Sequence, residues 1–321
     1  MKIEIKYPKL ANLYSFVSNL SQWNKVACVP QRQKEWIQKT GKLKPQEKAN
    51  LNTFSKILQQ TKINLEPIFL FEEYKKVWPT ISRKVSKTES EQIQLIFKIF
   101  ENRFNKIWSE ENKKLKIIAK KFKGQNSQIN SRLETIRKLC GLKKQQLPKK
   151  IEVRLLLSSN FQEECQGWSF KDKIVLECSG WPLQKIDYLI NNIFLHECFH
   201  ILFKKNQKLF RVLKVMLNTH NKILKKFISK IWSPEIIFEE VLISSFLPEG
   251  YLTEKFSKIN VQQIAKKELL KQKNDNLTRL RYFSALYFYD LAKKYVEENK
   301  PLDKFYFEKV IECISTYFNS K

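Results

Sequence analysis

The chain has 321 residues, of which 42% are hydrophobic and 13% aromatic, a composition that excludes an intrinsically disordered protein and allows one large or two ordinary domains. Sixty lysine and arginine residues against 32 acidic ones give a net charge of +28, which favours acidic proteins, nucleic acids and anionic surfaces as partners. The lysines are spread along the whole chain without an arginine cluster or an RNA-binding signature, so nucleic-acid binding has no motif in its support.

The sequence has no apolar stretch that would suit a signal peptide or a membrane span. Its six cysteines form no Cys-x-x-Cys pair, and several lie in apolar segments, as buried thiols do in a reducing compartment. They are Cys28, Cys140, Cys165, Cys178, Cys198 and Cys313. We therefore expect a cytoplasmic protein, with delivery of a bacterial effector by a specialised route as the alternative.

Residues 1–147 are predicted to form an all-helical N-terminal region. The segment that starts at Pro45 has apolar residues at helical spacing, and a long amphipathic stretch begins at the capping residue Thr88 and ends at Gly124. A further helix closes on Gly141, since glycine after the last apolar turn is a helix stop signal. No motif in this region indicates its role.

After Pro148 the pattern changes, and we place a domain boundary there. Residues 149–160 and 173–178 are rich in branched side chains and predict two strands, joined by a connection that contains Gly167. The predicted helices that follow are 183–205, 207–231, 234–247, 260–272, 276–297 and 303–318. The expected fold class is therefore α+β, mainly α with a small β-sheet, in which residues 148–321 form the catalytic domain.

The sequence NNIFLHECFHILFKK, residues 191–205, contains two of the three histidines of the chain. His196 and His200 are four residues apart, so in a helix they lie one turn apart on the same face and can bind one metal ion. Glu197 is rotated by about 60° from His200, which places its carboxylate beside the metal as a general base for a zinc-bound water. The surrounding helix is apolar, and a metal supplies the partner that these buried polar groups need. The alternative is a pair of hydrogen-bonded core histidines.

The His-Glu-x-x-His pattern resembles that of the zincin metallopeptidases over roughly residues 150–250. This resemblance implies a zinc-dependent peptidase in which an edge strand before the active-site helix pairs with the substrate backbone, and residues 173–178 occupy that place in the chain. A metzincin would continue with a glycine and a third histidine, which do not follow His200 at the required spacing. A gluzincin instead takes a glutamate from a later helix as its third ligand.

Glu239 and Glu240 lie in an otherwise apolar segment and are the candidates for that third ligand. We prefer Glu240, because Ser244 stands four residues later, where gluzincins place an aspartate that supports the first histidine. Glu239 would face only apolar residues one turn on. A solvated position at the edge of the helix is the alternative for one of the two glutamates.

His220 is the rival third ligand, since a helix-turn-helix can bridge it to His200. His220 or Tyr251 can instead stabilise the oxyanion of the reaction, because zincins often use a histidine or tyrosine donor for this purpose. The leading hypothesis is a gluzincin-like zinc metallopeptidase acting on a peptide or protein substrate, for which the positive charge favours acidic sequences. The alternative is a catalytically inactive zincin-fold binding module whose basic surface contacts nucleic acid.

Overall fold

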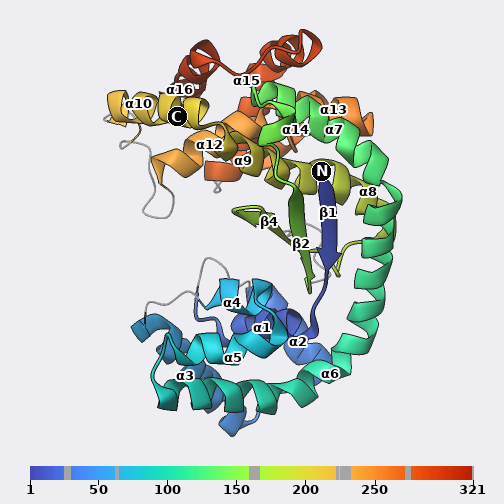
Figure 1. Ribbon diagram of the computed structural model, residues 1–321, viewed down its shortest axis with the longest axis vertical. Helices are drawn as coiled ribbons and strands as arrows, with labels where there is room; N and C mark the ends of the chain where they lie inside the picture. Colours follow the sequence, from blue (N-terminus) through green and yellow to red (C-terminus); the bar gives the residue numbers. More distant parts are fainter. Residues whose placement is uncertain are drawn as a thin grey trace.

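A computed structural model describes residues 1–24, 30–61, 65–158, 167–221, 224, 233–271 and 276–319 of the chain. These residues form a mainly helical protein with one small mixed β-sheet, so the expected α+β class is confirmed. Two groups of helices lie at opposite ends of the molecule with the sheet between them (Figure 1). The long helix α6 (Lys87–Gly124) runs along one side and joins the two groups.

Five N-terminal helices pack against the first half of α6. They are α1 (Lys9–Ser21), α2 (Pro30–Thr40), α3 (Pro45–Thr61), α4 (Glu66–Phe71) and α5 (Tyr74–Ser82). Aromatic rings fill the space between them, with Phe16 against Trp36 and Phe104, and Phe54 edge-on to Phe97. Because such rings bury large apolar areas, this cluster supplies the N-terminal group with a hydrophobic core of its own.

Helix α6 starts at a capping box and not at Thr88 as expected. The Ser86 hydroxyl accepts a hydrogen bond from the backbone N–H of Glu89 at 3.2 Å, and the Glu89 carboxylate accepts one from the backbone N–H of Ser86 at 2.8 Å. The helix ends at Gly124, in agreement with the sequence.

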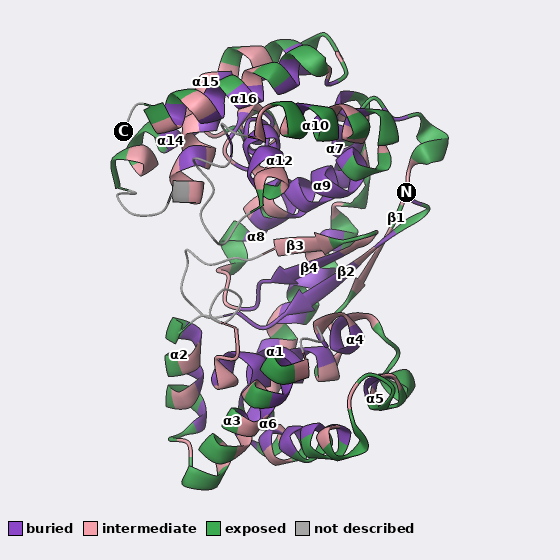
Figure 2. Ribbon diagram, turned by 90° about the vertical axis from the view of Figure 1, so that its left-hand side faces the viewer, coloured by how far each residue is buried: buried purple, intermediate pink, exposed green. Residues whose placement is uncertain are grey.

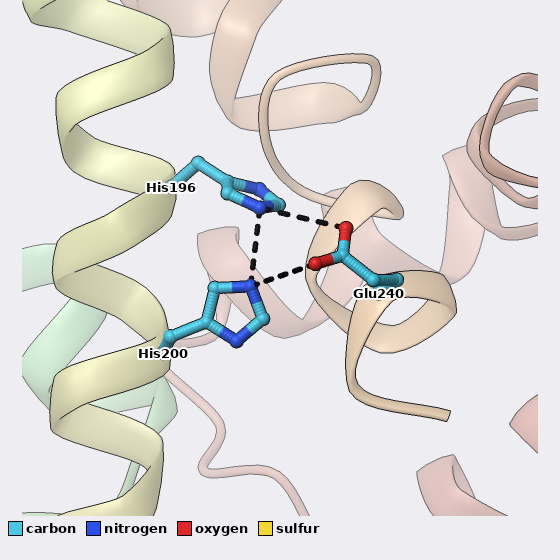
Figure 3. A group of neighbouring side chains, drawn as sticks. All are labelled: His196, His200 and Glu240. Atoms are coloured by element: carbon cyan, nitrogen blue, oxygen red, sulfur yellow. Dashed lines mark hydrogen bonds and ion pairs between the residues drawn. The ribbon is translucent and has the colours of Figure 1, made fainter. Parts of the chain in front are cut away.

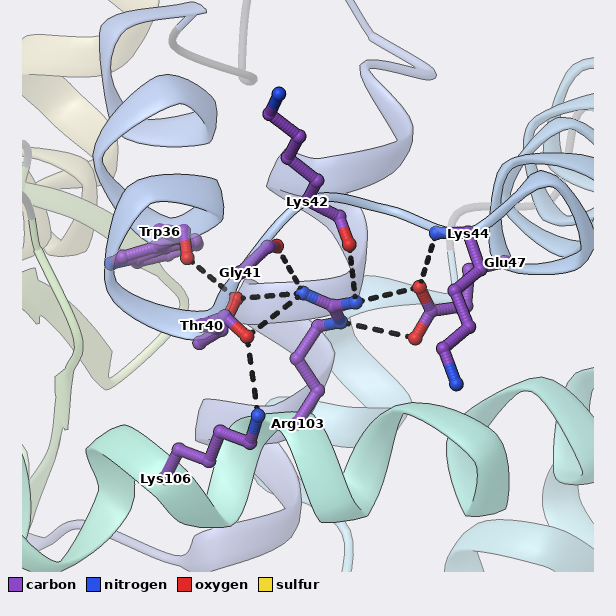
Figure 4. A network of polar contacts seen from close by, with 8 residues as sticks. All are labelled: Trp36, Thr40, Gly41, Lys42, Lys44, Glu47, Arg103 and Lys106. Atoms are coloured by element: carbon purple, nitrogen blue, oxygen red, sulfur yellow. Dashed lines mark hydrogen bonds and ion pairs between the residues drawn. The ribbon is translucent and has the colours of Figure 1, made fainter.

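A buried arginine joins α6 to the loop between α2 and α3 (Figure 4). The Arg103 guanidinium donates to the Glu47 carboxylate at 2.6 Å and to the backbone carbonyls of Thr40 and Lys42 at 3.2 and 3.1 Å. A charge removed from water needs partners of this kind, so Arg103 holds the loop in one conformation.

The sheet has four strands in the order β1-β2-β4-β3. They are β1 (Lys2–Lys6), β2 (Lys150–Leu156), β3 (Gly167–Phe170) and β4 (Lys173–Glu177). Strands β1, β2 and β4 are parallel, with Ile3 opposite Ile151, and β3 is antiparallel to β4.

Three expectations about the strands were wrong. The N-terminal region is not all-helical, because β1 pairs with a strand that follows it by almost 150 residues, and a five-residue segment carries no sign of so distant a partner. Strand β2 ends at Leu156, before the expected position 160. The connection with Gly167 contains a strand of its own, β3.

Helices α1 and α4 cover one face of the sheet, and α9 (Leu195–Lys205) covers the other (Figure 2). Ile174 and Leu176 of β4 belong to the same buried cluster as α9, whereas Val175 packs with Leu70 of α4. The alternation of side chains along a strand therefore separates the two cores.

The remaining helices form the C-terminal group. They are α7 (Asn126–Leu139), α8 (Ile186–Tyr188), α10 (Gln207–Thr219), α12 (Pro234–Ser244), α13 (Tyr251–Ser257), α14 (Val261–Lys271), α15 (Asn276–Glu297) and α16 (Lys304–Asn319). Most of their bounds agree closely with the sequence. The helix expected over 234–247 ends at Ser244, and helix α13 was not expected at all. Most of the segment expected to extend helix 207–231 beyond Thr219 lies outside the described residues. None of the helices that the structure describes combines the length and the apolarity needed to cross a bilayer.

The largest buried cluster draws on both sides of residue 148. Leu115 of α6 and Ile136 of α7 pack in the same cluster as Phe194, Phe238 and Tyr306. The second half of α6 and all of α7 therefore support the C-terminal group, and a domain boundary at 148 stays a prediction.

Candidate metal centre

Helix α9 carries the His-Glu-x-x-His motif between the sheet and helices α7 and α12. Every residue from Leu195 to Phe203 is buried, which agrees with the apolar character of the segment on all sides. The six residues before it, Leu189–Phe194, form a π-helical turn, a local widening that is frequent at functional sites. The motif is thus held by packing around the whole circumference of the helix.

Two histidines and a glutamate converge at the centre of this group (Figure 3). The Nε2 atoms of His196 and His200 are 3.1 Å apart. Glu240 on α12 places its Oε1 atom 3.2 Å from Nε2 of His200 and its Oε2 atom 3.6 Å from Nε2 of His196. The three residues can therefore hold one metal ion, and the preferred third ligand, Glu240, is the glutamate that completes the group.

The spacing of these atoms suits a single metal ion, because one ligand atom from each residue lies within 4.8 Å of the other two. Zinc binds nitrogen and oxygen at about 2.0–2.1 Å, so neighbouring ligand atoms in a tetrahedron are about 3.3 Å apart. The two Nε2 atoms, 3.1 Å apart, and the pair of Glu240 Oε1 with Nε2 of His200, 3.2 Å apart, are close to that value, whereas the separation of 3.6 Å from Nε2 of His196 belongs to the other carboxylate oxygen, Oε2. Three protein ligands also leave the fourth position of a tetrahedron open, as a catalytic site requires.

The second ring nitrogen of each histidine fixes the direction of its metal-binding atom. Nδ1 of His196 lies 2.9 Å from the backbone carbonyl of Leu247, and Nδ1 of His200 lies 3.0 Å from the Glu239 carboxylate. Both partners accept hydrogen bonds, so both Nδ1 atoms donate. The Nε2 atom of each ring is therefore the one that faces the ligand group, where it can bind a metal ion or carry a proton.

Two expectations about the surroundings of the ligands were wrong. Glu239 is neither solvated nor directed at apolar residues, since only 3% of its surface is exposed and it binds both His200 and the Lys204 ammonium, the latter at 3.0 Å. Ser244 does not support His196, because its hydroxyl accepts a hydrogen bond from Nε of Arg281 at 3.0 Å. A backbone carbonyl has the role that was expected of the serine.

Arg281 on α15 is a member of the site that the sequence did not indicate. Its Nη2 atom lies 2.9 Å from the Glu249 carboxylate, and its Nε atom lies 3.7 Å from Oε2 of Glu240. The position is one of several cationic positions in α15, and nothing in the local sequence separates it from a solvated arginine.

The carboxylates and the histidines shift the pKa values of one another. Burial alone would lower the pKa of His200, but its hydrogen bonds with Glu239 and Glu240 outweigh that effect and raise the pKa to about 10. Burial alone would raise the pKa of Glu240, yet the hydrogen bonds and charges of His196 and His200, with the charge of Arg281, hold it well below its usual range. A proton and a metal ion therefore compete for the same position.

Glu197 lies where α9 meets strand β3. A Cβ atom built on Gly167 would be 3.2 Å from Cγ of Glu197, so the glycine lets the strand approach this side chain closely. Among the described residues, Glu197 has no hydrogen-bonding or ion-pair partner, which leaves its carboxylate available to a proton.

The edge strand beside α9 is β3, and not 173–178 as expected. Strand β4 pairs with β2 on one side and with β3 on the other, so both of its edges are occupied. Strand β3 is the last in the sheet, and no other described strand pairs with its outer edge. The expected strand was therefore one position too far inside the sheet.

No known protein family, curated protein or solved structure matches the chain. The arrangement of His196, His200, Glu240 and Glu197 is thus the basis for any statement about function.

The two candidates for oxyanion stabilisation lie in other surroundings. The Tyr251 hydroxyl donates to the Glu297 carboxylate at 2.9 Å, and its ring stands edge-on to Tyr289. His220 is half-buried at the C-terminal end of α10 and does not belong to the ligand group found among the described residues. A catalytic role for either residue stays a prediction.

Proposed function

We propose that the protein is a zinc-dependent metallopeptidase of the gluzincin type. The observation that carries the proposal is the convergence of two Nε2 atoms and one carboxylate around a position that one metal ion can occupy, with both Nδ1 atoms bound to acceptors. Nitrogen ligands disfavour calcium and magnesium, which prefer oxygen, and two histidines with one glutamate are a common zinc ligand set.

Several residues of the chain would then take part in amide hydrolysis, each with a separate role. A zinc ion at this position would polarise the scissile carbonyl and lower the pKa of a water molecule to about 7. Glu197 accepts the proton that the attacking water loses and delivers it to the departing amine. The free edge of β3 binds the backbone of an extended peptide and places a peptide bond near Glu197. Glu239 and the carbonyl of Leu247 hold the imidazoles in place throughout.

One observation favours the alternative of a binding module. The outer face of α6 carries five exposed lysines along its second half: Lys106, Lys113, Lys116, Lys120 and Lys123. Such a row suits a phosphate backbone and would bind it with a steep dependence on salt. This alternative gives no role to the buried carboxylate of Glu197 in the His-Glu-x-x-His motif.

Zinc content and peptide cleavage test the proposal together. We expect about one zinc per chain in both the wild type and Glu197→Gln, with cleavage of a mixed peptide library lowered about 10²–10⁴-fold in the variant. Zinc bound without cleavage, combined with salt-dependent retention of nucleic acid, would favour the binding module. A protein that holds no zinc and cleaves no peptide would refute the peptidase.

A further inference from the structure

A second cavity lies across the sheet from the metal centre. It has a volume of about 210 Å³ and is formed by α1, α4 and the strands β2, β3 and β4. Trp23, Glu66 and Trp168 are the half-buried members of its lining and form its mouth. Because ligand sites for whole small molecules usually measure about 300–1,000 Å³, this cavity suits a single side chain.

Strand β3 connects the cavity with the metal centre. Gly167 lies opposite Leu176, on the face that carries α9, and its neighbour Trp168 lies opposite Val175, on the face that carries α1 and α4. Figure 2 shows β3 between these two groups of helices. An extended peptide on the edge of β3 also alternates its side chains between the two faces. A residue next to the one over Glu197 therefore points toward the cavity.

The lining of the cavity favours a cation. The carboxylates of Glu66 and Glu177 both belong to it, and Arg32, which pairs with Glu177 at 2.6 Å, is not part of the lining. Burial and the nearby charge of Glu177 raise the pKa of Glu66 to about 7, so a positive charge that enters the cavity would favour the ionised form of Glu66.

Two further features of the lining point to the same ligand. Trp23 and Trp168 also line the cavity, and the faces of aromatic rings attract cationic groups. The Ser15 hydroxyl also lines the cavity, is only 5% exposed and has no hydrogen-bonding partner among the residues that the structure describes. A donor that enters the cavity would satisfy it.

We propose that this cavity binds the basic side chain, lysine or arginine, of a peptide held along the free edge of β3. The inference rests on the proposed peptidase function for its choice of ligand. It also revises the preference for acidic substrates, because the net charge of +28 acts at long range whereas two carboxylates line the position beside the scissile bond.

Peptide binding tests this inference separately from catalysis. Three decapeptides that differ only in one central residue, arginine, citrulline or glutamate, are titrated into Glu197→Gln, which lacks the proposed base and so consumes no peptide. We expect the arginine peptide to bind at least about tenfold more tightly than the citrulline peptide, and the glutamate peptide to bind most weakly. Adding Glu66→Gln should remove most of the preference, whereas adding Glu91→Gln, which removes a charge from an exposed face of α6, should keep it.

Equal binding of the arginine and citrulline peptides, or a preference that survives Glu66→Gln, would overturn the inference. Unchanged binding of the citrulline peptide shows that the Glu66→Gln protein is folded. If that variant is unfolded, Trp168→Leu is used in its place. We expect its preference for the arginine peptide over the citrulline peptide to fall at least about threefold, because the aromatic ring is missing. Peptide cleavage by the wild type is measured separately. Cleavage without a preference for a basic residue would contradict only this inference. Preferential binding of the arginine peptide without any cleavage would contradict only the proposed peptidase function.

Discussion

The two adjacent glutamates of α12 have different roles, and a pair of substitutions separates them. Glu239 binds Nδ1 of His200, while Glu240 faces the Nε2 atoms of both histidines. Replacing Glu239 by glutamine keeps an oxygen that accepts the hydrogen bond and removes only the charge. Replacing it by alanine removes both, and the imidazole of His200 is then free to turn.

These differences set the expected zinc affinities. Loss of a residue that orients a metal ligand weakens binding about 10–100-fold, which corresponds to about 1.4–2.7 kcal/mol. We expect Glu239→Gln near the lower limit and Glu239→Ala near the upper limit. Glu240→Ala, which removes a ligand, should weaken binding by more than about 100-fold.

Competition with a chromophoric chelator measures these affinities over the required range. Lys204→Met is the control, because it removes the half-exposed partner of Glu239 and should change the affinity less than about fivefold. If Glu239→Ala weakens binding more than Glu240→Ala, the assignment of ligand and supporting residue is reversed. If neither variant changes the affinity, the metal is bound elsewhere.

Three further predictions concern pH and stability. Because the pKa of His200 is raised, a proton must leave the imidazole before zinc binds. The zinc affinity should therefore fall about tenfold for each unit by which the pH is lowered from 8 to 6. An affinity that does not change with pH would contradict this competition. Gly250→Ala would place a Cβ atom 1.9 Å from the backbone oxygen of Ser245, so the free energy of unfolding measured with urea should fall by at least about 1–3 kcal/mol. The control is Gly124→Ala, which has open space at its Cβ and should change the free energy of unfolding by less than about 0.5 kcal/mol. Arg103→Met leaves the partly buried Glu47 without its arginine partner and should cost about 1–3 kcal/mol of unfolding free energy with zinc affinity unchanged, and a neutral result would show that the network contributes little.

Local patterns in the sequence predicted local features of the structure. The spacing of His196 and His200 determines that both side chains share one face of a helix, because the α-helix repeats every 3.6 residues. The apolar segments after residue 180 became helices with nearly the expected bounds, since each carries its own periodicity and its own stop signals. Burial of the motif followed in the same way from the apolar residues on every side of it.

The partners of those features were decided by the tertiary structure. Strand β1 needs a partner far along the chain, and β3 became the edge strand because β2 occupies the other side of β4. The carbonyl of Leu247 and the guanidinium of Arg281 reach the site through a turn and a distant helix, which no local pattern encodes. Helical periodicity is a property of a few consecutive residues, so the sequence alone determined how the two histidines and the neighbouring Glu197 are arranged on their helix. The place of Glu240 in the group, the acceptors that bind the Nδ1 atoms and the cavity across the sheet depend on how separate elements pack, and only the folded chain brings them together.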